Sequence, residues 1–128
     1  MAAEASDADV RGFSLISAVG RIAIGLGMLA APEPALRALG FSDVNATTVA
    51  VARVAGIRDL VLGGVTLAAL DDRDRLRTAT VGNTTADAGD SLAFALAIRT
   101  DQRTAGFRGV ATALPAALAG LWVAWRLR

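Results

Sequence analysis

Hydrophobic residues gather in four long stretches that are separated by short polar or charged segments. The stretches cover residues 12–31, 47–70, 78–98 and 106–125, and each is about as long as a helix that crosses a bilayer. The last stretch carries no charge from Gly109 to Trp125 and is apolar on all sides, which is typical of a helix surrounded by lipid. We therefore predict an all-α fold, a four-helix transmembrane bundle that forms a single domain over residues 1–128.

The segments between the stretches predict short connections in water or at the membrane interface. Pro32 and Pro34 end the first helix, and residues 35–41 are expected to form a short amphipathic turn. A highly charged loop is expected over residues 71–77, and a polar loop over residues 99–103. Four spans place both termini on the same side of the membrane.

The composition excludes several classes of function. The chain contains no His, Cys or Lys, so zinc sites, disulfides and imidazole or thiol catalysis are not available to it. We expect no metal site and no cofactor, since no cofactor-binding motif is present either. A net charge of +1 gives no argument for a nucleic-acid partner. The lack of Lys also argues against a soluble helical bundle, whose outer faces normally carry it.

Arginines on the two sides of the predicted bundle favour one orientation. The side that holds the termini would carry Arg11, Arg73, Arg75, Arg77, Arg126 and Arg128, and the opposite side would carry Arg37, Arg99, Arg103 and Arg108. Because arginine is enriched on the cytoplasmic side, we expect a multi-pass protein of a bacterial-type cell membrane with both termini in the cytoplasm.

Six charged residues lie inside the predicted spans, and five of them lie near the middle of a span. They are Arg21 in the first span, Arg53, Arg58 and Asp59 in the second, and Asp87 and Asp90 in the third, with Arg53 the outlier. Each unpaired charge at mid-bilayer costs roughly 2.5 to 3.5 kcal/mol, so six would cost on the order of 15 to 20 kcal/mol. We therefore expect the charges to face inward and to neutralise one another.

Depth along the spans predicts which charges pair. Arg53 is expected to reach Asp90, Arg58 to reach Asp87, and Arg21 to reach Asp59. Helical geometry also places Asn83 on the same face of the third span as both aspartates.

Charged groups inside a membrane usually mark a functional site. Arginine donors could meet the oxygens of a lipophilic or quinone-like small molecule, with Arg21, Arg53, Arg58, Asp59 and Asn83 as ligand-binding residues. Alternatively, a carboxyl beside an arginine could serve as acid or base in isomerisation, cyclisation or epoxide opening, with Asp87 and Asp90 as the catalytic residues. Whether the protein is an enzyme stays open.

A structural role is the third hypothesis. In this case the ion pairs only fix which helices meet, and the protein is a membrane subunit without a ligand. The expected partners are the lipid bilayer, a lipophilic small molecule and further copies of the chain. Glycines in the first two spans favour close helix packing in lipid.

Three segments resemble an uncharacterised family of small bacterial four-span integral membrane proteins. They are residues 20–27, residues 56–64 with the sequence Gly-Ile-Arg-Asp-Leu, and the Asp-x-x-Asp segment at residues 87–90. More distantly, the arrangement is similar to the DoxX-like group, some of whose members are subunits of quinone-linked sulfur oxidoreductases. The resemblance implies a four-span topology and a connection to quinones.

Overall fold

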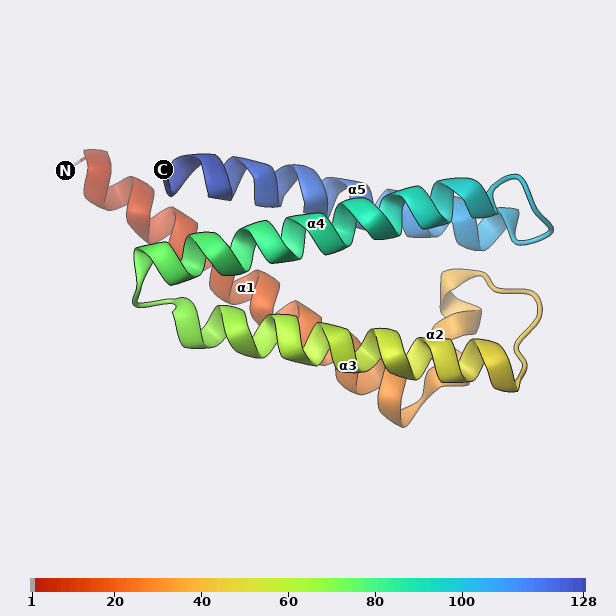
Figure 1. Cartoon of the computed structure of the whole chain (residues 1–128). Helices are drawn as coiled ribbons and strands as arrows, with labels where there is room; N and C mark the ends of the chain where they lie inside the picture. The colour runs from red at the N-terminus through yellow and green to blue at the C-terminus, as the bar shows by residue number, and fades with distance from the viewer. Residues whose placement is uncertain (1) are drawn as a thin grey trace.

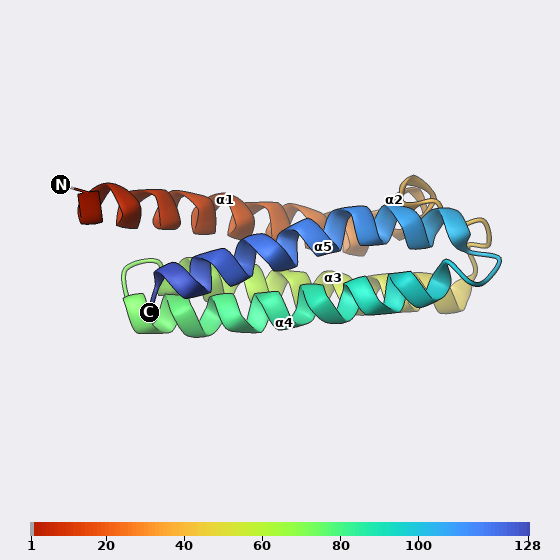
Figure 2. The same cartoon turned by 90° about the horizontal axis from the view of Figure 1, so that it is seen from above.

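The computed structural model describes residues 2–128, with side chains from Ala8 onward, and this part of the chain is all-helical. It contains five helices and no strand: α1 (Ala2–Ala30), α2 (Pro32–Leu39), α3 (Ala46–Ala69), α4 (Arg73–Ala97) and α5 (Arg103–Arg126). The four long helices run side by side (Figures 1 and 2). The start of α1, the α3–α4 turn and the end of α5 lie at one end of the bundle, which we call the terminal end. The short helix α2 and the α4–α5 connection lie at the other.

The long helices pack mainly as two pairs, α1 with α3 and α4 with α5, and the pairs meet less closely through α3 and α4. Glycines allow the close approach within the first pair. A Cβ atom built on Gly25 would lie 2.6 Å from the carbonyl oxygen of Gly56, and one on Gly63 would lie 2.8 Å from that of Ala18. Gly20, Gly27 and Gly64, also expected to pack closely, face open space instead.

The proline-rich segment after α1 forms α2, which begins at Pro32 rather than at the predicted residue 35. Proline at the first helical position suits a helix start, because its missing amide proton has no partner there in any case. The helix ends at Leu39 and is capped by Gly40, whose φ of 92° is a left-handed conformation that favours glycine. Leu36 and Pro32 are buried, so the amphipathic turn covers the end of the bundle as a short helix.

The prediction of a long charged loop over residues 71–77 is wrong. The Asp72 side chain accepts hydrogen bonds from the amides of Asp74 and Arg75 and caps α4, which therefore begins at Arg73. Only residues 70–72 connect α3 to α4. Asn45 caps α3 in the same way, in a capping box with Thr48.

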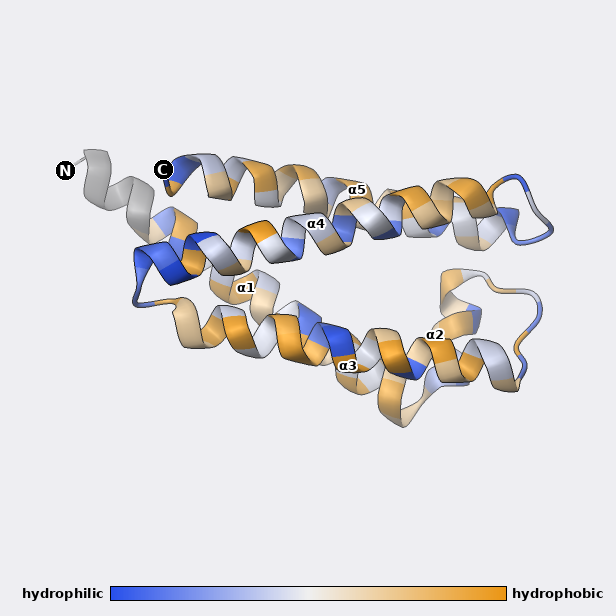
Figure 3. Cartoon of the chain, viewed as in Figure 1, coloured by the Kyte–Doolittle hydropathy of each residue, from blue (hydrophilic) through white to orange (hydrophobic). Residues whose placement is uncertain are grey.

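The bundle buries polar side chains and exposes apolar ones. Its buried polar and charged residues are Ser14, Arg21, Asp59, Thr66, Thr80, Asn83, Thr84 and Asp87. Large apolar side chains such as Ile16, Val54 and Leu92 are exposed over more than 60% of their surface. Figure 3 shows the hydrophilic positions at the loops and near the middle of α1, α3 and α4.

Among the described residues, two helices are long and apolar enough to cross a membrane by length and composition. They are Ala8–Ala30 of α1 and Arg103–Arg126 of α5. Helices α3 and α4 are as long, at 24 and 25 residues, but carry the central charges.

Candidate functional site

The central charges meet where the α1/α3 pair contacts α4. Arg21 on α1 donates from Nη1 to Asp59 of α3 at 3.0 Å and from Nη2 to both carboxylate oxygens of Asp87 on α4 at 2.5 and 2.6 Å. The three side chains are only 10 to 12% exposed. We call these residues the closed half of the cluster, and they connect three helices at one point.

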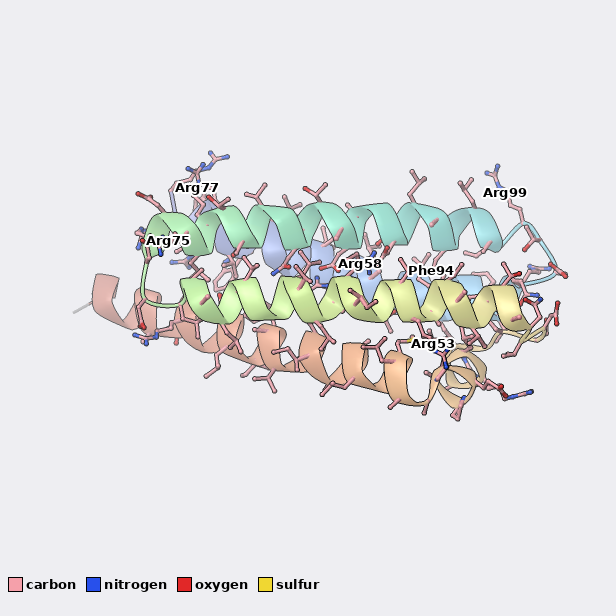
Figure 4. All side chains as sticks on the ribbon, turned by 60° about the horizontal axis from the view of Figure 1, so that its bottom comes forward. Arg53, Arg58, Arg75, Arg77, Phe94 and Arg99 are labelled. Atoms are coloured by element: carbon pink, nitrogen blue, oxygen red, sulfur yellow. The ribbon has the colours of Figure 1, made fainter. Side chains whose placement is uncertain are left out.

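The second arginine forms the open half of the cluster. Arg58 on α3 donates from both terminal nitrogens to Asp90 on α4, with both distances 2.7 Å. Figure 4 shows Arg58 between these two helices. The side chains are 38% and 30% exposed, so this pair reaches the outer surface of the bundle. Arg58 also lies 3.5 Å from Asp59, which joins the two halves.

Two of the three predicted ion pairs are wrong, and the third is confirmed. Arg21 pairs with Asp59 as expected, but Arg58 pairs with Asp90 rather than Asp87. Arg53 does not reach Asp90: it is exposed, and Figure 4 shows it on the side of α3 away from α4. The physical reason is rotation about the helix axis, since five residues turn the chain by about 140° and move Arg53 to another face.

The exclusion of Arg53 changes the charge of the cluster. The residues that the structure brings together are two arginines, Arg21 and Arg58, and three aspartates, Asp59, Asp87 and Asp90. The neutral cluster of three positive and three negative charges was a wrong prediction. One negative charge is in excess.

A small cavity with both polar and apolar walls adjoins the closed half at Asp87, and we call it the polar cavity for its six oxygen-bearing side chains. Its volume is about 70 Å³, and it lies between α1, α3, α4 and α5. Its oxygen-bearing lining residues are Ser14, Ser17, Thr66, Thr80, Asn83 and Asp87. This volume holds a few water molecules, whereas pockets for organic ligands measure about 300 to 1,000 Å³.

A larger apolar groove follows the seam between α3 and α4 toward the terminal end. Its volume is about 570 Å³. Leu62, Val65 and Ala69 line it on α3, Ala79 and Gly82 line it on α4, and Asp74 and Arg75 lie at its rim. Leu62 and Val65 lie one and two turns from Arg58 on the same face of α3, so the groove leads toward the open half of the cluster.

The other predicted site residues differ in how far they are exposed. Asn83 is buried and lines the polar cavity, where its amide nitrogen donates to Thr66 Oγ1 at 2.9 Å. Of the two predicted catalytic carboxylates, Asp87 is closed off and Asp90 is half-exposed. Thr66 was not predicted, although it lies seven residues after Asp59 and thus on the same face of α3.

No metal centre emerges from the residues that the structure describes, where no three carboxylate, imidazole or thiol side chains group to hold an ion. Compared with protein-family models, with curated proteins and with solved structures, the chain matches none of them. The resemblance to small four-span proteins and to the DoxX-like group therefore stays a prediction.

Proposed function

We propose that the chain is a four-span membrane protein that binds a lipophilic small molecule with an oxygen-bearing head group at the Arg58–Asp90 pair. The observation that carries this proposal is the position of the pair, which is partly exposed on a surface that carries many apolar side chains. A charged pair that faces hydrocarbon is costly unless polar groups cover it. A ligand with polar oxygens would supply that cover.

The distribution of polarity supports insertion into a membrane. A soluble bundle buries its large apolar side chains and exposes its charges. In this bundle Arg21, Asp59 and Asp87 are buried, whereas Ile16 and Leu92 are exposed. Trp122 and Trp125 are exposed near the terminal end, with the Arg126 guanidinium 5.3 and 5.7 Å from their ring centres. Such groups are common at the membrane interface.

The ion pairs explain how α3 and α4 could also span the membrane. Each is about 36 Å long at 1.5 Å per residue, which exceeds the hydrocarbon thickness of roughly 30 Å. Apart from its charged residues α3 is apolar, and α4 is polar at its start and at Asp87 and Asp90. Four of these charges, Arg58, Asp59, Asp87 and Asp90, form ion pairs within the bundle together with Arg21. We further propose that the arginine-rich terminal end faces the cytoplasm.

The groove supports the choice of a lipophilic ligand. Its volume of about 570 Å³ falls within the range of small-molecule pockets, and its walls are mostly apolar. The hydrocarbon part of a ligand would lie along Leu62, Val65 and Ala79, and its head would reach the pair at mid-depth. A quinone-like head suits this place, because its carbonyl oxygens accept hydrogen bonds from a guanidinium and its reduced hydroxyls donate to a carboxylate.

The test removes the pair without leaving a charge behind. In the double variant Arg58→Leu with Asp90→Leu, both charges disappear, and replacement of a buried pair by apolar residues often leaves a fold intact. We expect it to fold and to lose the lipophilic molecule found by mass spectrometry in solvent extracts of the detergent-purified protein. Titration with a short-chain quinone should show the same loss. Arg53→Leu, on the same helix but outside the cluster, should bind like the unchanged protein.

A second pair of variants tests the groove. A Cβ atom built on Gly82 meets no atom within 4 Å, and neither does one on Gly89, but only Gly82 lines the groove. Gly82→Leu should therefore fill the groove and reduce quinone binding, whereas Gly89→Leu should not. Equal binding by the double leucine variant and the unchanged protein would contradict the proposal.

A structural role is the second candidate, and the closed half of the cluster favours it. Arg21 joins α1, α3 and α4 and is nearly inaccessible. If no molecule co-purifies and no quinone binds, the ion pairs serve only to fix the helices. An acid–base enzyme has a weaker basis, because its two expected carboxylates do not share one accessible pocket.

A further inference from the structure

The charge of the cluster points to a missing cation. Arg21 and Arg58 contact three carboxylates, and the third arginine expected in the cluster, Arg53, lies outside it on an exposed face. The excess negative charge lies within a bundle that exposes many large apolar side chains. A buried charge without compensation is strongly unfavourable, so one positive charge is required near these carboxylates.

Three of the hydroxyl groups that line the polar cavity next to Asp87 can only accept. The hydroxyl groups of Ser14, Thr66 and Thr80 each donate at 2.8 Å to the carbonyl four residues earlier in the same helix. Their single protons are therefore used, and their lone pairs are left for a further partner. Together with the Asp87 carboxylate, these groups form a wall of acceptors.

Asn83 adds an acceptor that has no donor. Its amide nitrogen must face Thr66, because the Thr66 hydroxyl already donates to a carbonyl and can only accept from the amide. This fixes the orientation of the amide and leaves Oδ1 as the free atom. Asn83 is 8% exposed, and its Oδ1 is buried without a hydrogen-bond partner among the described residues. A buried acceptor of this kind indicates a ligand with positive charge or with protons to donate.

We propose that this cavity binds one sodium ion between Asp87, Asn83 and the hydroxyls of Thr66 and Thr80. Hard cations prefer carboxylate, amide and hydroxyl oxygens as ligands. A single positive charge equals the excess of the cluster, whereas a divalent ion would reverse it. The volume of about 70 Å³ accepts an ion with a few waters and excludes an organic cation. The site is independent of the α3–α4 groove and of any ligand there.

The apolar end of the bundle would close this site from the terminal side. Val10, Ala69, Leu76, Ala79, Val123 and Leu127 form the one hydrophobic cluster of buried residues in the described part of the chain. Val123 belongs both to this cluster and to the cavity wall. An ion held there would be shielded from water on this side, so we expect slow exchange toward the terminal end.

The experiment measures sodium directly on the full chain in detergent. Binding of radiolabelled Na⁺ should saturate at one ion per chain, and the thermal midpoint should rise with NaCl but not with choline chloride at equal ionic strength. Thr80→Val, which removes one acceptor and keeps the volume, should weaken binding about tenfold, equivalent to about 1.4 kcal/mol. Asp87→Asn, which removes the excess charge, should abolish binding and the salt response.

Thr85 provides the matched control. Its hydroxyl also donates to the carbonyl four residues earlier, but it is exposed on another face of α4. Thr85→Val should bind sodium like the unchanged protein. Sodium binding that is absent, or equally weakened in both threonine variants, would overturn the proposal. A thermal midpoint that changes with pH but not with sodium concentration would overturn it as well, because a proton would then supply the positive charge. If Asp87→Asn does not fold, the threonine pair decides.

Discussion

Arg21 is the residue whose removal should cost the bundle most. It donates to Asp59 at 3.0 Å and to Asp87 at 2.5 Å, and all three side chains are about nine-tenths buried. The change Arg21→Met keeps much of the side-chain length and removes the charge. Both carboxylates then lose their closest donor, and the excess charge of the cluster rises from one to two.

The magnitude follows from what each carboxylate retains. Asp59 keeps Arg58 at 3.5 Å, whereas Asp87 keeps no guanidinium within ion-pair distance in the described structure. Removal of one partner of a buried pair costs about 3 to 5 kcal/mol. Because the unpaired Asp87 dominates this cost, Asp87→Asn in the Arg21→Met background should recover at least about 2 kcal/mol of it.

Reversible unfolding in mixed detergent micelles, followed by circular dichroism, measures these free energies of unfolding. Arg53→Met is the matched control, because Arg53 is exposed and lies outside the cluster, and it should change stability by less than about 0.5 kcal/mol. A cost for Arg21→Met no larger than that of the control would refute the reasoning. The reasoning would also be refuted if the changes in the free energy of unfolding caused by Arg21→Met and Asp87→Asn simply added in the double variant.

Three further predictions concern the pairing, the packing and the topology. Arg58→Asp and Asp90→Arg should each lower stability, and the double reversal should restore part of the loss in the same unfolding assay. Gly25→Leu should cost more than about 2 kcal/mol, because its Cβ would lie 2.6 Å from the Gly56 oxygen, whereas Gly27→Leu meets nothing within 4 Å and should be tolerated. Tags at the two termini should be accessible from the same side of the membrane in inverted vesicles, and tags on opposite sides would contradict the four-span topology.

The positions of two helices were predicted to within three residues, because in both the apolar stretch covers nearly the whole helix. Residues 47–70 were expected for α3 (Ala46–Ala69), and residues 106–125 for α5 (Arg103–Arg126). Helices α1 and α4 begin ten and five residues before the predicted spans, because acidic and basic residues continue a helix without adding hydrophobicity. Hydropathy therefore marks the apolar part of a helix and not its capped start.

The ion-pair partners within the cluster could be predicted only in part. The prediction used the height of each residue along the bundle, but the rotation of each residue about its helix axis also decides which side chains meet. Arg53 and Asp90 were matched by height along the bundle, yet rotation about α3 turns Arg53 away. The inward faces were predicted better: Arg21 on α1 and Asn83 and Asp87 on α4 are all buried, as expected. The tertiary arrangement of the two pairs, which brings Arg58 to Asp90, is not encoded in any single helix.

The two halves of the cluster have different surroundings. We therefore expect the closed half to contribute to the stability of the fold and the open half to contribute to ligand binding. The closed half joins three helices and excludes other partners, so its charges act on the fold. The open half joins only α3 and α4, and its exposed edge leads into an apolar groove. Asp59 contacts both arginines. A ligand that moves Arg58 away from Asp59 would leave Arg21 as the main partner of this carboxylate and would strengthen the Arg21–Asp59 ion pair. Binding at the open half should therefore stabilise the α1–α3 contact.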